Sequence, residues 1–377
     1  MKYYIIAGEA SGDLHAANLM RAIKQEDPEA EFRFWGGDLM QKAGGTTVKH
    51  YRDLAFMGFA EVLLNLRTIL SNISFCKKDI TAWQPDVLIF VDYPGFNLRI
   101  AKWARKEGFK THFYISPQIW AWKENRIKEI RRDIDEMYVI LPFEKEFYEE
   151  KHQFDVHFVG HPLIDAIANR PQVDISEFKS RHQLDERPVI ALLPGSRKQE
   201  ISKMLKTMLS ITGDFEEYQF VIAGAPSQDP EFYAPYIKKK NVHLVMNQTY
   251  DVLSLATAAL VTSGTATLET ALFKVPEVVC YKGSFISYEI AKRIIKLDYI
   301  SLVNLVMDRE VVKELIQKDF NKKNLKIELK KILSEENRTK MFEDYHDLEL
   351  KLGGTGASKK TAALIVKSIS STSKNDI

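Results

Sequence analysis

A glycine-containing turn between a short apolar run and a helical pattern is the first place in this chain where chemistry could occur. The turn opens the segment SGTATLE at residues 263–269, which follows the small apolar run 258–261. Apolar residues then recur at helical spacing, which predicts a helix that begins at Ser263 or Thr265. The free backbone N–H groups of such a helix start, at and after Gly264, would suit phosphate or pyrophosphate. Glu269 follows about one turn later, where its carboxylate could accept hydrogen bonds from two ribose hydroxyls; an ordinary helix cap is the alternative.

Two further turns carry polar residues directly after apolar runs. Gly195, Ser196 and Arg197 follow the run 188–193, and they offer backbone donors and a guanidinium fork to a diphosphate. Asp92 follows the run 86–91, where burial would raise its pKa towards the working range of a general base. Taken singly, each turn also fits a structural interpretation, as a turn with a solvated arginine or a carboxylate that caps a loop.

The first turn of the chain, GEASGD at residues 8–13, follows the apolar run 3–7. It lacks the G-x-G-x-x-G spacing of dinucleotide-binding proteins, which argues against a nicotinamide enzyme. Glu9 and Ser11 could hydrogen-bond a sugar or a phosphate, and a structural turn capped by Asp13 is the alternative. The sequence Asp133-Ile134-Asp135 matches the D-x-D pattern of metal-dependent glycosyltransferases, but charged residues surround it and we interpret it as solvated charge. The histidines show no metal-binding spacing, so we expect neither a metal nor a cofactor.

An unusually wide apolar stripe lies in the segment that begins at Met57. Within it, Val62, Leu66 and Ile69 share one helical face. A core helix explains most of the stripe, and its extra width would suit an acyl-chain groove or a helix that dips into a membrane.

Aromatic and basic residues gather in the same part of the chain. Trp120 and Trp122 lie in the segment SPQIWAW at 116–122, and ten Lys or Arg against three Glu fall between Arg99 and Arg132. This combination would suit a membrane surface or an anionic lipid. A solvated basic face beside core tryptophans is the alternative.

The elements that must hold these turns alternate between short apolar runs and longer amphipathic runs, which predicts parallel βα units. The pattern pauses over residues 169–186 and then restarts. We therefore predict an α/β protein of two Rossmann-like, doubly wound domains, with a polar tail frayed from Ser368. A net charge of +2 in 377 residues gives no indication of a nucleic-acid partner, and two distant cysteines fit a reducing cytoplasm. No apolar stretch is long enough for a transmembrane helix.

Read together and in order, these segments resemble the lipid-A-disaccharide synthase family, which are inverting glycosyltransferases of the GT-B type. The resemblance covers almost the whole chain. Its motifs are GEASGD (8–13), MGFAEVL (57–63), DYPGFN (92–97), SPQIWAW (116–122), LPFEKEFY (141–148), GHPLID (160–165), LPGSR (193–197), SGTATLE (263–269) and SLVNLVMDREVVKELIQ (301–317).

The resemblance implies a reaction between UDP-2,3-diacylglucosamine and 2,3-diacylglucosamine 1-phosphate (lipid X) that gives a β-1,6-linked disaccharide and UDP. It implies that Asp92 is the base, with Glu9 and Ser11 beside it in the cleft. Arg197 would bind the donor diphosphate, and Glu269 its ribose. The lipid-binding candidates are Met57, Val62, Leu66, Ile69 and Trp120, and the remaining donor-binding candidates are Gly195, Ser196, Ser263, Gly264, Thr265 and Asn304.

The resemblance also implies that the two domains face each other across a cleft. We expect an acceptor domain at residues 1–168 and a donor domain at 169–344, with a helix at about 345–368 packing back on the first. The protein would be cytoplasmic and peripheral on the cytoplasmic face of the inner membrane, and a homodimer is one assembly that we consider.

The sequence departs from the family pattern at three positions, and two other functions compete with the one that the resemblance implies. The family commonly has Asp where Gly95 stands, an apolar residue where Glu277 stands, and Pro where Val303 stands. The competitors are another GT-B glycosyltransferase or UDP-sugar epimerase, and a non-catalytic protein that presents anionic glycolipid.

Overall fold

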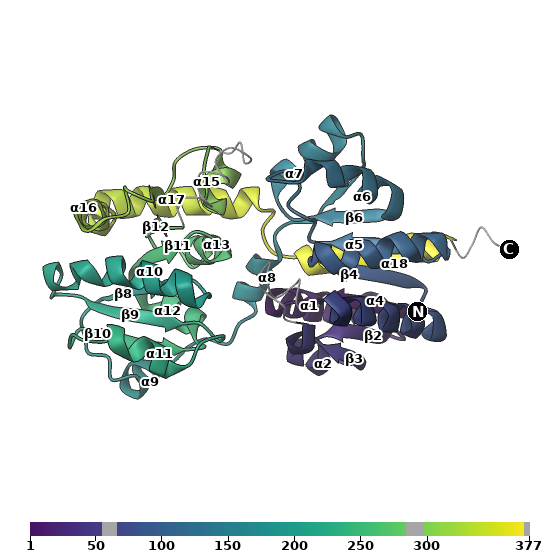
Figure 1. Cartoon of the computed structure of the whole chain (residues 1–377). Helices are drawn as coiled ribbons and strands as arrows, with labels where there is room; N and C mark the ends of the chain where they lie inside the picture. The colour runs from purple at the N-terminus through teal and green to yellow at the C-terminus, as the bar shows by residue number, and fades with distance from the viewer. Residues whose placement is uncertain (55–65, 284–297, 373–377) are drawn as a thin grey trace. The chain divides into compact units, whose positions relative to one another are not determined.

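The computed structural model describes residues 1–54, 66–283 and 298–372. It divides the chain into two compact units (Figure 1). Unit 1 comprises Met1–Asn169 and the chain from Leu352 onwards, and unit 2 comprises Arg170–Lys351. Each unit is a parallel α/β sheet with helices on both faces, so the predicted fold class is confirmed.

The sheet of unit 1 has the strand order β3-β2-β1-β4-β5-β6-β7 in the described residues, and all its pairings are parallel. Its strands are β1 (Lys2–Ala7), β2 (Glu31–Gly36), β3 (Thr46–His50), β4 (Val87–Val91), β5 (Thr111–Tyr114), β6 (Glu136–Val139) and β7 (His157–Phe158). The order reverses between β1 and β4, where Ala7 pairs with Val91. In doubly wound sheets, ligands bind at the carboxyl ends of the strands that flank such a switch point.

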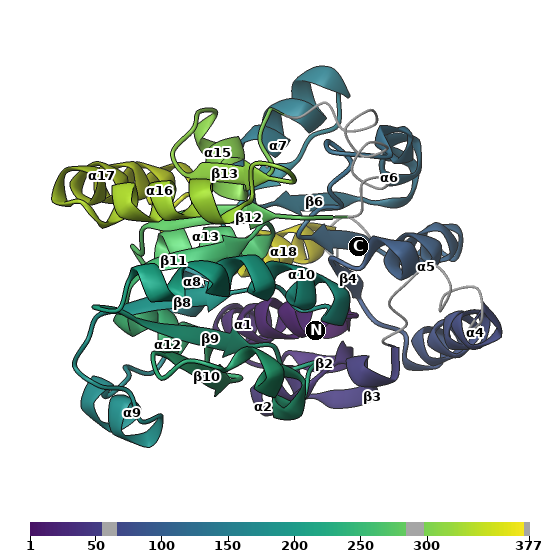
Figure 2. The same cartoon turned by 60° about the vertical axis from the view of Figure 1, so that its left-hand side comes forward.

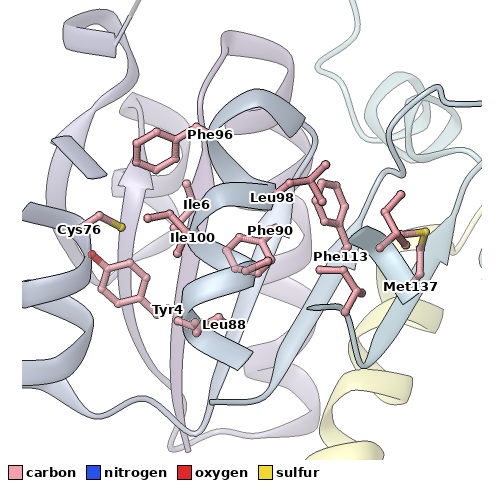
Figure 3. Close-up of a cluster of buried hydrophobic side chains, with 14 of the residues drawn as sticks. Tyr4, Ile6, Cys76, Leu88, Phe90, Phe96, Leu98, Ile100, Phe113 and Met137 are labelled. Carbon is pink, nitrogen blue, oxygen red and sulfur yellow. The ribbon is translucent and has the colours of Figure 1, made fainter. Parts of the chain in front are cut away.

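Helices cover both faces of this sheet. They are α1 (Ala10–Glu26), α2 (Asp38–Ala43), α4 (Leu66–Trp83), α5 (Pro94–Lys106), α6 (Ile127–Asp133), α7 (Pro142–Glu146), α8 (Pro162–Ala168) and α18 (Ala357–Thr372), with short turns at Tyr51–Leu54, Glu124–Arg126 and Phe147–Lys151. Figure 3 shows Phe96, Leu98 and Ile100 of α5 against the strand residues Ile6, Leu88 and Phe90. Burial of each such side chain stabilises the fold by about 1.5–3 kcal/mol.

The last helix, α18, belongs to unit 1 and packs against α1 and α8. Asp165 of α8 accepts hydrogen bonds from the backbone N–H groups of Gly356 (2.6 Å) and Ser358 (2.9 Å), and it thereby caps the start of α18. Gly160, with a φ of +91°, passes close to the backbone of Gly353, and a Cβ on either glycine would crowd the other segment. The GHPLID motif at 160–165 is therefore the docking site of the C-terminal helix.

The sheet of unit 2 has the order β10-β9-β8-β11-β12-β13 in the described residues, again with parallel pairings. The strands are β8 (Val189–Leu193), β9 (Gln219–Gly224), β10 (Val242–Met246), β11 (Ala256–Thr262), β12 (Glu277–Tyr281) and β13 (Lys313–Ile316). The helices are α9 (Ile175–Arg181), α10 (Lys198–Met208), α11 (Pro230–Tyr233), α12 (Thr249–Leu255), α13 (Thr265–Leu272), α15 (Leu302–Met307), α16 (Lys322–Leu333) and α17 (Glu335–Lys351), with turns at Leu209–Asp214 and Ala234–Tyr236. The switch point lies between β8 and β11, and α16 and α17 lie side by side (Figure 2).

Four elements differ from the sequence prediction. The polar pause at 169–186 contains α9, which Asp174 caps by accepting a hydrogen bond from the N–H of Glu177. The tail is not frayed from Ser368, because α18 continues to Thr372. The strands β3 and β13 were not predicted, since their sequences, TTVKH and KELI, contain no apolar run.

Candidate functional site

A cavity of about 330 Å³ opens in unit 2 at the carboxyl ends of β8 and β11, the two strands that flank the switch point. Val261 pairs with Leu193 there, so the turns that follow the two strands meet. The cavity therefore brings together most of the predicted donor-binding residues. It is lined by Leu193, Gly195, Ser196, Glu200, Ala223, Ala225, Pro226, Thr249, Thr262, Ser263, Gly264, Thr265, Ala266 and Glu269.

The start of α13 forms one wall of this cavity. Its N-cap residue is Gly264, which provides no side-chain acceptor for the first N–H groups of the helix. A Cβ at Gly264 would meet no atom within 4 Å, so the approach to these N–H groups is open. This is the geometry of an anion site at a helix start. The Ser263 side chain takes a different role, because its Oγ donates to the carbonyl of Ile300 (2.8 Å).

Glu269 lies in the same wall, one turn along α13, and is half-buried. Burial raises the pKa of its carboxyl, and a hydrogen bond from the Tyr250 hydroxyl to Oε1 (2.9 Å) opposes that rise. Burial and the Glu269 charge raise the pKa of Tyr250, so the phenol stays protonated as a donor. A half-buried carboxylate held in this way can accept hydrogen bonds from sugar hydroxyls.

The turn after β8 also lines the cavity. Gly195 has a φ of +99°, which favours glycine, and a Cβ at this position would collide with the Glu200 side chain. Ser196 donates its backbone N–H to Glu200 Oε2 (3.3 Å), and its carbonyl accepts the Ser227 hydroxyl (2.8 Å). Arg197 is exposed at the N-cap of α10, beside the cavity, but it is not among the lining residues.

Asn304 is fully buried, and both ends of its amide are engaged within unit 2. Its Oδ1 accepts the N–H groups of Val311 (2.8 Å) and Val312 (3.0 Å), and its Nδ2 donates to Glu314 Oε1 (2.9 Å). Glu314 also accepts the backbone N–H groups of Ile300 and Ser301. Asn304 therefore orders the loop that follows residue 299, and its contact with a donor stays a prediction.

In unit 1, Glu9 and Ser11 are exposed at the start of the 17-residue helix α1. Asp92 follows the neighbouring strand β4, so these residues share the switch point of the first sheet. Asp92 and Tyr93 both have left-handed backbone conformations, with φ of 48° and 49°. The Tyr93 ring packs where a Cβ of Gly8 would lie, and this contact requires a glycine at position 8.

Burial and, to a smaller extent, the nearby Glu9 charge raise the pKa of the Asp92 carboxyl to about 6, although a hydrogen bond from the Tyr93 backbone acts in the opposite direction. An acid with this pKa is mostly ionised at pH 7, yet it binds a proton more readily than an ordinary aspartate does. The buried side chain of Asn97 donates to the Asp92 carbonyl (2.6 Å) and so fixes the turn. The turn thus presents a carboxylate suited to proton transfer.

The predicted structural cap in the first turn acts on another element. Asp13 is buried, and its carboxylate accepts the N–H groups of Gly37 (2.8 Å), Met40 (3.0 Å) and Leu39 (3.1 Å). It therefore caps α2 rather than its own turn.

The loop that carries Trp120 is anchored by a residue that the sequence interpretation did not select. Glu144 is buried, and its Oε1 accepts the Ser116 hydroxyl (2.6 Å) and the Trp120 indole N–H (3.2 Å). Its Oε2 accepts the backbone N–H groups of Ile140 and Leu141. Burial raises the pKa of Glu144, and these four hydrogen bonds oppose the rise. Its place at the third position of α7, after a proline, was the available sequence signal.

The other lipid-binding candidates lie in or beside α4. Met57 and Val62 lie outside the described residues, as does the side chain of Leu66. Ile69 is partly buried against the core of unit 1, whereas Leu70 and Phe75 of the same helix are 55% and 47% exposed. No helix in the three described ranges is long and apolar enough to cross a membrane.

The interpretation of Asp133-Ile134-Asp135 as solvated charge is wrong for Asp133, which is buried, whereas Asp135 is exposed as expected. Asp133 is buried and pairs with Arg132, and Asp135 accepts the N–H of Thr111 (2.9 Å) and pairs with Arg105. The Asp135 carboxylate thus holds the start of β5, whereas the Asp133 carboxylate binds an arginine of its own helix. Across the described ranges, no group of three or more His, Cys, Asp or Glu side chains could hold a metal ion.

The fold of the two units defines the structural class of the protein. The chain resembles the UDP-GlcNAc 2-epimerase from Neisseria meningitidis bound to UDP-GlcNAc, with a TM-score of 0.67, 13% identity, and coverage of 97% of this chain and 100% of that chain. It also resembles a glycosyltransferase from Rickettsia africae ESF-5, with a TM-score of 0.57, 12% identity and 98% coverage of both chains. Two parallel-sheet units with these neighbours constitute the GT-B architecture.

Sequence similarity then identifies the family. The family model described as lipid-A-disaccharide synthetase matches residues 3–368. Lipid-A-disaccharide synthases from Syntrophus aciditrophicus (40% identical over 370 residues, 96% of each chain) and Trichlorobacter lovleyi (37% over 373 residues, 97% of each) match it along nearly their full length. The chain belongs to the lipid-A-disaccharide synthase family. It is a glycosyltransferase of lipid A biosynthesis.

Proposed function

We propose that the protein transfers 2,3-diacylglucosamine from UDP-2,3-diacylglucosamine to the 6-hydroxyl of lipid X, with inversion, and releases UDP. The observation that carries this proposal is the unit 2 cavity, in which the start of α13 and the Glu269 carboxylate lie in one wall. The helix start suits the diphosphate, and the carboxylate suits the ribose. Unit 2 would therefore bind the donor, and unit 1 the acceptor.

The reaction is a single displacement. The acceptor O6 attacks the anomeric carbon, its proton passes to Asp92, and the bond from that carbon to the diphosphate breaks with its electron pair on UDP. The raised pKa of Asp92, about 6, suits it to accept this proton near neutral pH. Arg197 at the N-cap of α10, together with the positive end of α13, would stabilise the departing diphosphate. Glu9 and Ser11, at the start of α1, would contact the acceptor sugar.

The acyl chains of both substrates require contact with a lipid surface, and we propose that unit 1 provides it at the cytoplasmic face of the inner membrane. Leu70 and Phe75 expose apolar side chains on α4. Trp122 is 49% exposed, and the Lys123 ammonium lies 4.3 Å from its ring centroid. Such apolar and basic groups together favour binding to anionic vesicles, and a double Leu70→Ser, Phe75→Ser variant should bind them more weakly.

The direct test is to mix the purified protein with UDP-2,3-diacylglucosamine and lipid X in detergent. We expect the disaccharide 1-phosphate and one UDP for each product, and UDP release should require lipid X. UDP release without lipid X, or conversion of UDP-GlcNAc to its 2-epimer, would contradict the proposal. Failure of UDP to bind to the wild-type protein would remove its basis altogether.

A further inference from the structure

Thr262 is the last residue of β11 and lines the unit 2 cavity, yet its hydroxyl has no hydrogen-bond partner in the described structure. The residue is only 4% exposed. Buried hydroxyl groups are almost always hydrogen-bonded, because an unsatisfied one costs about 1–3 kcal/mol. An unsatisfied hydroxyl in the wall of a binding cavity indicates a partner that arrives with the ligand.

The other buried threonines described in unit 2 show the usual arrangement. Thr212 donates to the Leu209 carbonyl (3.0 Å), Thr267 to that of Gly264 (2.8 Å) and Thr270 to that of Ala266 (2.8 Å). Each of these bonds is internal to a helical turn. Thr262 lies at the end of a strand, and its hydroxyl has no hydrogen-bond partner in the described structure. It therefore differs from these three threonines both in its position and in its hydrogen bonding.

We propose that the Thr262 hydroxyl donates a hydrogen bond to a phosphate oxygen of a nucleoside diphosphate bound in this cavity. The inference rests on the proposed donor site and adds to it a residue outside the set predicted from the sequence. Thr262 directly precedes the turn of Ser263 and Gly264 at the start of α13, which is the anion-binding end of the cavity. Glu269, the ribose partner, lies one turn farther along the helix. The hydroxyl therefore belongs to the phosphate end.

The test compares Thr262→Val with Thr262→Ser in the full-length protein, and uses UDP and uridine as calorimetric titrants. Valine keeps the β-branched shape of the strand residue and removes the hydroxyl, whereas serine retains it. We expect Thr262→Val to weaken UDP binding about tenfold and to leave uridine binding unchanged, because a bond to a charged phosphate is lost. Thr262→Ser should bind UDP as the wild type does, within about twofold.

Stability gives a second readout with a matched control. Without ligand, Thr262→Val should raise the melting temperature by about 2–4 °C, because it removes an unsatisfied buried hydroxyl. Thr212→Val removes a satisfied hydroxyl of a residue that does not line the cavity, so it should lower the melting temperature and leave UDP affinity unchanged.

The outcomes separate this inference from the proposed function. If the wild type binds UDP and Thr262→Val binds it equally well, the role of Thr262 is refuted while the donor site stands. An equal loss of uridine affinity would place the hydroxyl against the nucleoside and also refute the inference. If the wild type does not bind UDP at all, the proposed function itself fails.

Discussion

The Tyr250 hydroxyl donates a 2.9 Å hydrogen bond to Glu269 Oε1, and this bond joins α12 to α13 inside unit 2. Tyr250 is the second residue of α12 and precedes its partner by 19 residues. The bond acts on the ionised form of the carboxylate, because it lowers a pKa that burial raises. The charge and the orientation of the carboxylate that we propose to bind the ribose therefore depend on a residue outside the SGTATLE motif.

Tyr250→Phe should weaken UDP binding and make it more dependent on pH. Loss of a hydrogen bond to a charged group costs about 1.5–3 kcal/mol, part of which would appear as roughly a five- to fiftyfold loss of UDP affinity. The pKa of Glu269 would rise further, so affinity should begin to fall at a higher pH as the solution is acidified. Calorimetric titration with UDP between pH 5 and 8 measures both effects. Unchanged affinity over this range would show that Tyr250 does not support the site.

Asp92→Asn should nearly abolish transfer and stabilise the protein. Removal of a positioned base lowers kcat by about 10²–10⁴-fold. The pKa of Asp92 in the folded state is raised to about 6, so between about pH 4 and 6 the folded state holds a proton that the unfolded state has released. The stability of the wild type therefore falls as the pH rises through that window. The variant should thus exceed the wild type by about 1–3 kcal/mol at pH 8 and match it at pH 4. Near-normal turnover with saturating lipid X would refute the assignment of the base.

Much of this arrangement could be predicted from the sequence, because short apolar runs that end in polar turns fix both the strands and the ends at which ligands bind. The turns at Gly195 and Gly264 lie where the pattern placed them. The capping position of Glu144 had a sequence signal, but its bond to Trp120 and the bond of Tyr250 to Glu269 could not be predicted, since only the tertiary fold brings these partners together. Glu144 lies 24 residues from Trp120 along the chain, yet it accepts the indole N–H.

The helix α9 and the end of α18 could not be predicted from the sequence pattern either. The helix α9 is short and polar, so its residues match a linker as well as a helix. The C-terminal helix extends past Ser368 because its buried face continues along α1, and burial in tertiary contacts outweighs the low helix propensity of serine there. Asp133 was misjudged because adjacent arginines suggested solvation, whereas the residue is buried and its carboxylate pairs with Arg132.

Glu9→Gln should shift the acidic limb of the kcat/KM profile to lower pH. The Glu9 charge contributes to the raised pKa of Asp92, although burial is the larger cause, so the shift should be less than about one pH unit. Glu26→Gln, an equal change of charge at the other end of α1, is the matched control and should leave the profile in place. The measurement is kcat/KM from pH 5 to 8. A limb that stays near its wild-type position in Glu9→Gln would show that the two carboxylates do not interact in the working enzyme.

Glu277→Leu should raise stability, and the gain should grow with pH. Glu277 lies in β12 with no exposed surface, and neither of its carboxylate oxygens has a hydrogen-bond partner in the described structure. Burial raises its pKa well above the ordinary value, so the folded state retains a proton that the unfolded state loses. The stability that this proton contributes is complete below the unfolded pKa and is lost as the pH rises towards the folded pKa. The variant has no carboxyl at this position, so its stability should not show this loss.

The gain from Glu277→Leu should reach about 1–4 kcal/mol at pH 8, as for other buried ionisable groups replaced by apolar ones, and should be small at pH 4. Chemical denaturation at the two pH values measures it. Glu336→Leu, at an exposed position in α17, is the control and should change stability by less than about 0.5 kcal/mol at either pH. A loss of stability in Glu277→Leu that persists at pH 8 would mean that the carboxyl has a partner, and Glu277 would then be a structural requirement of β12 in this chain.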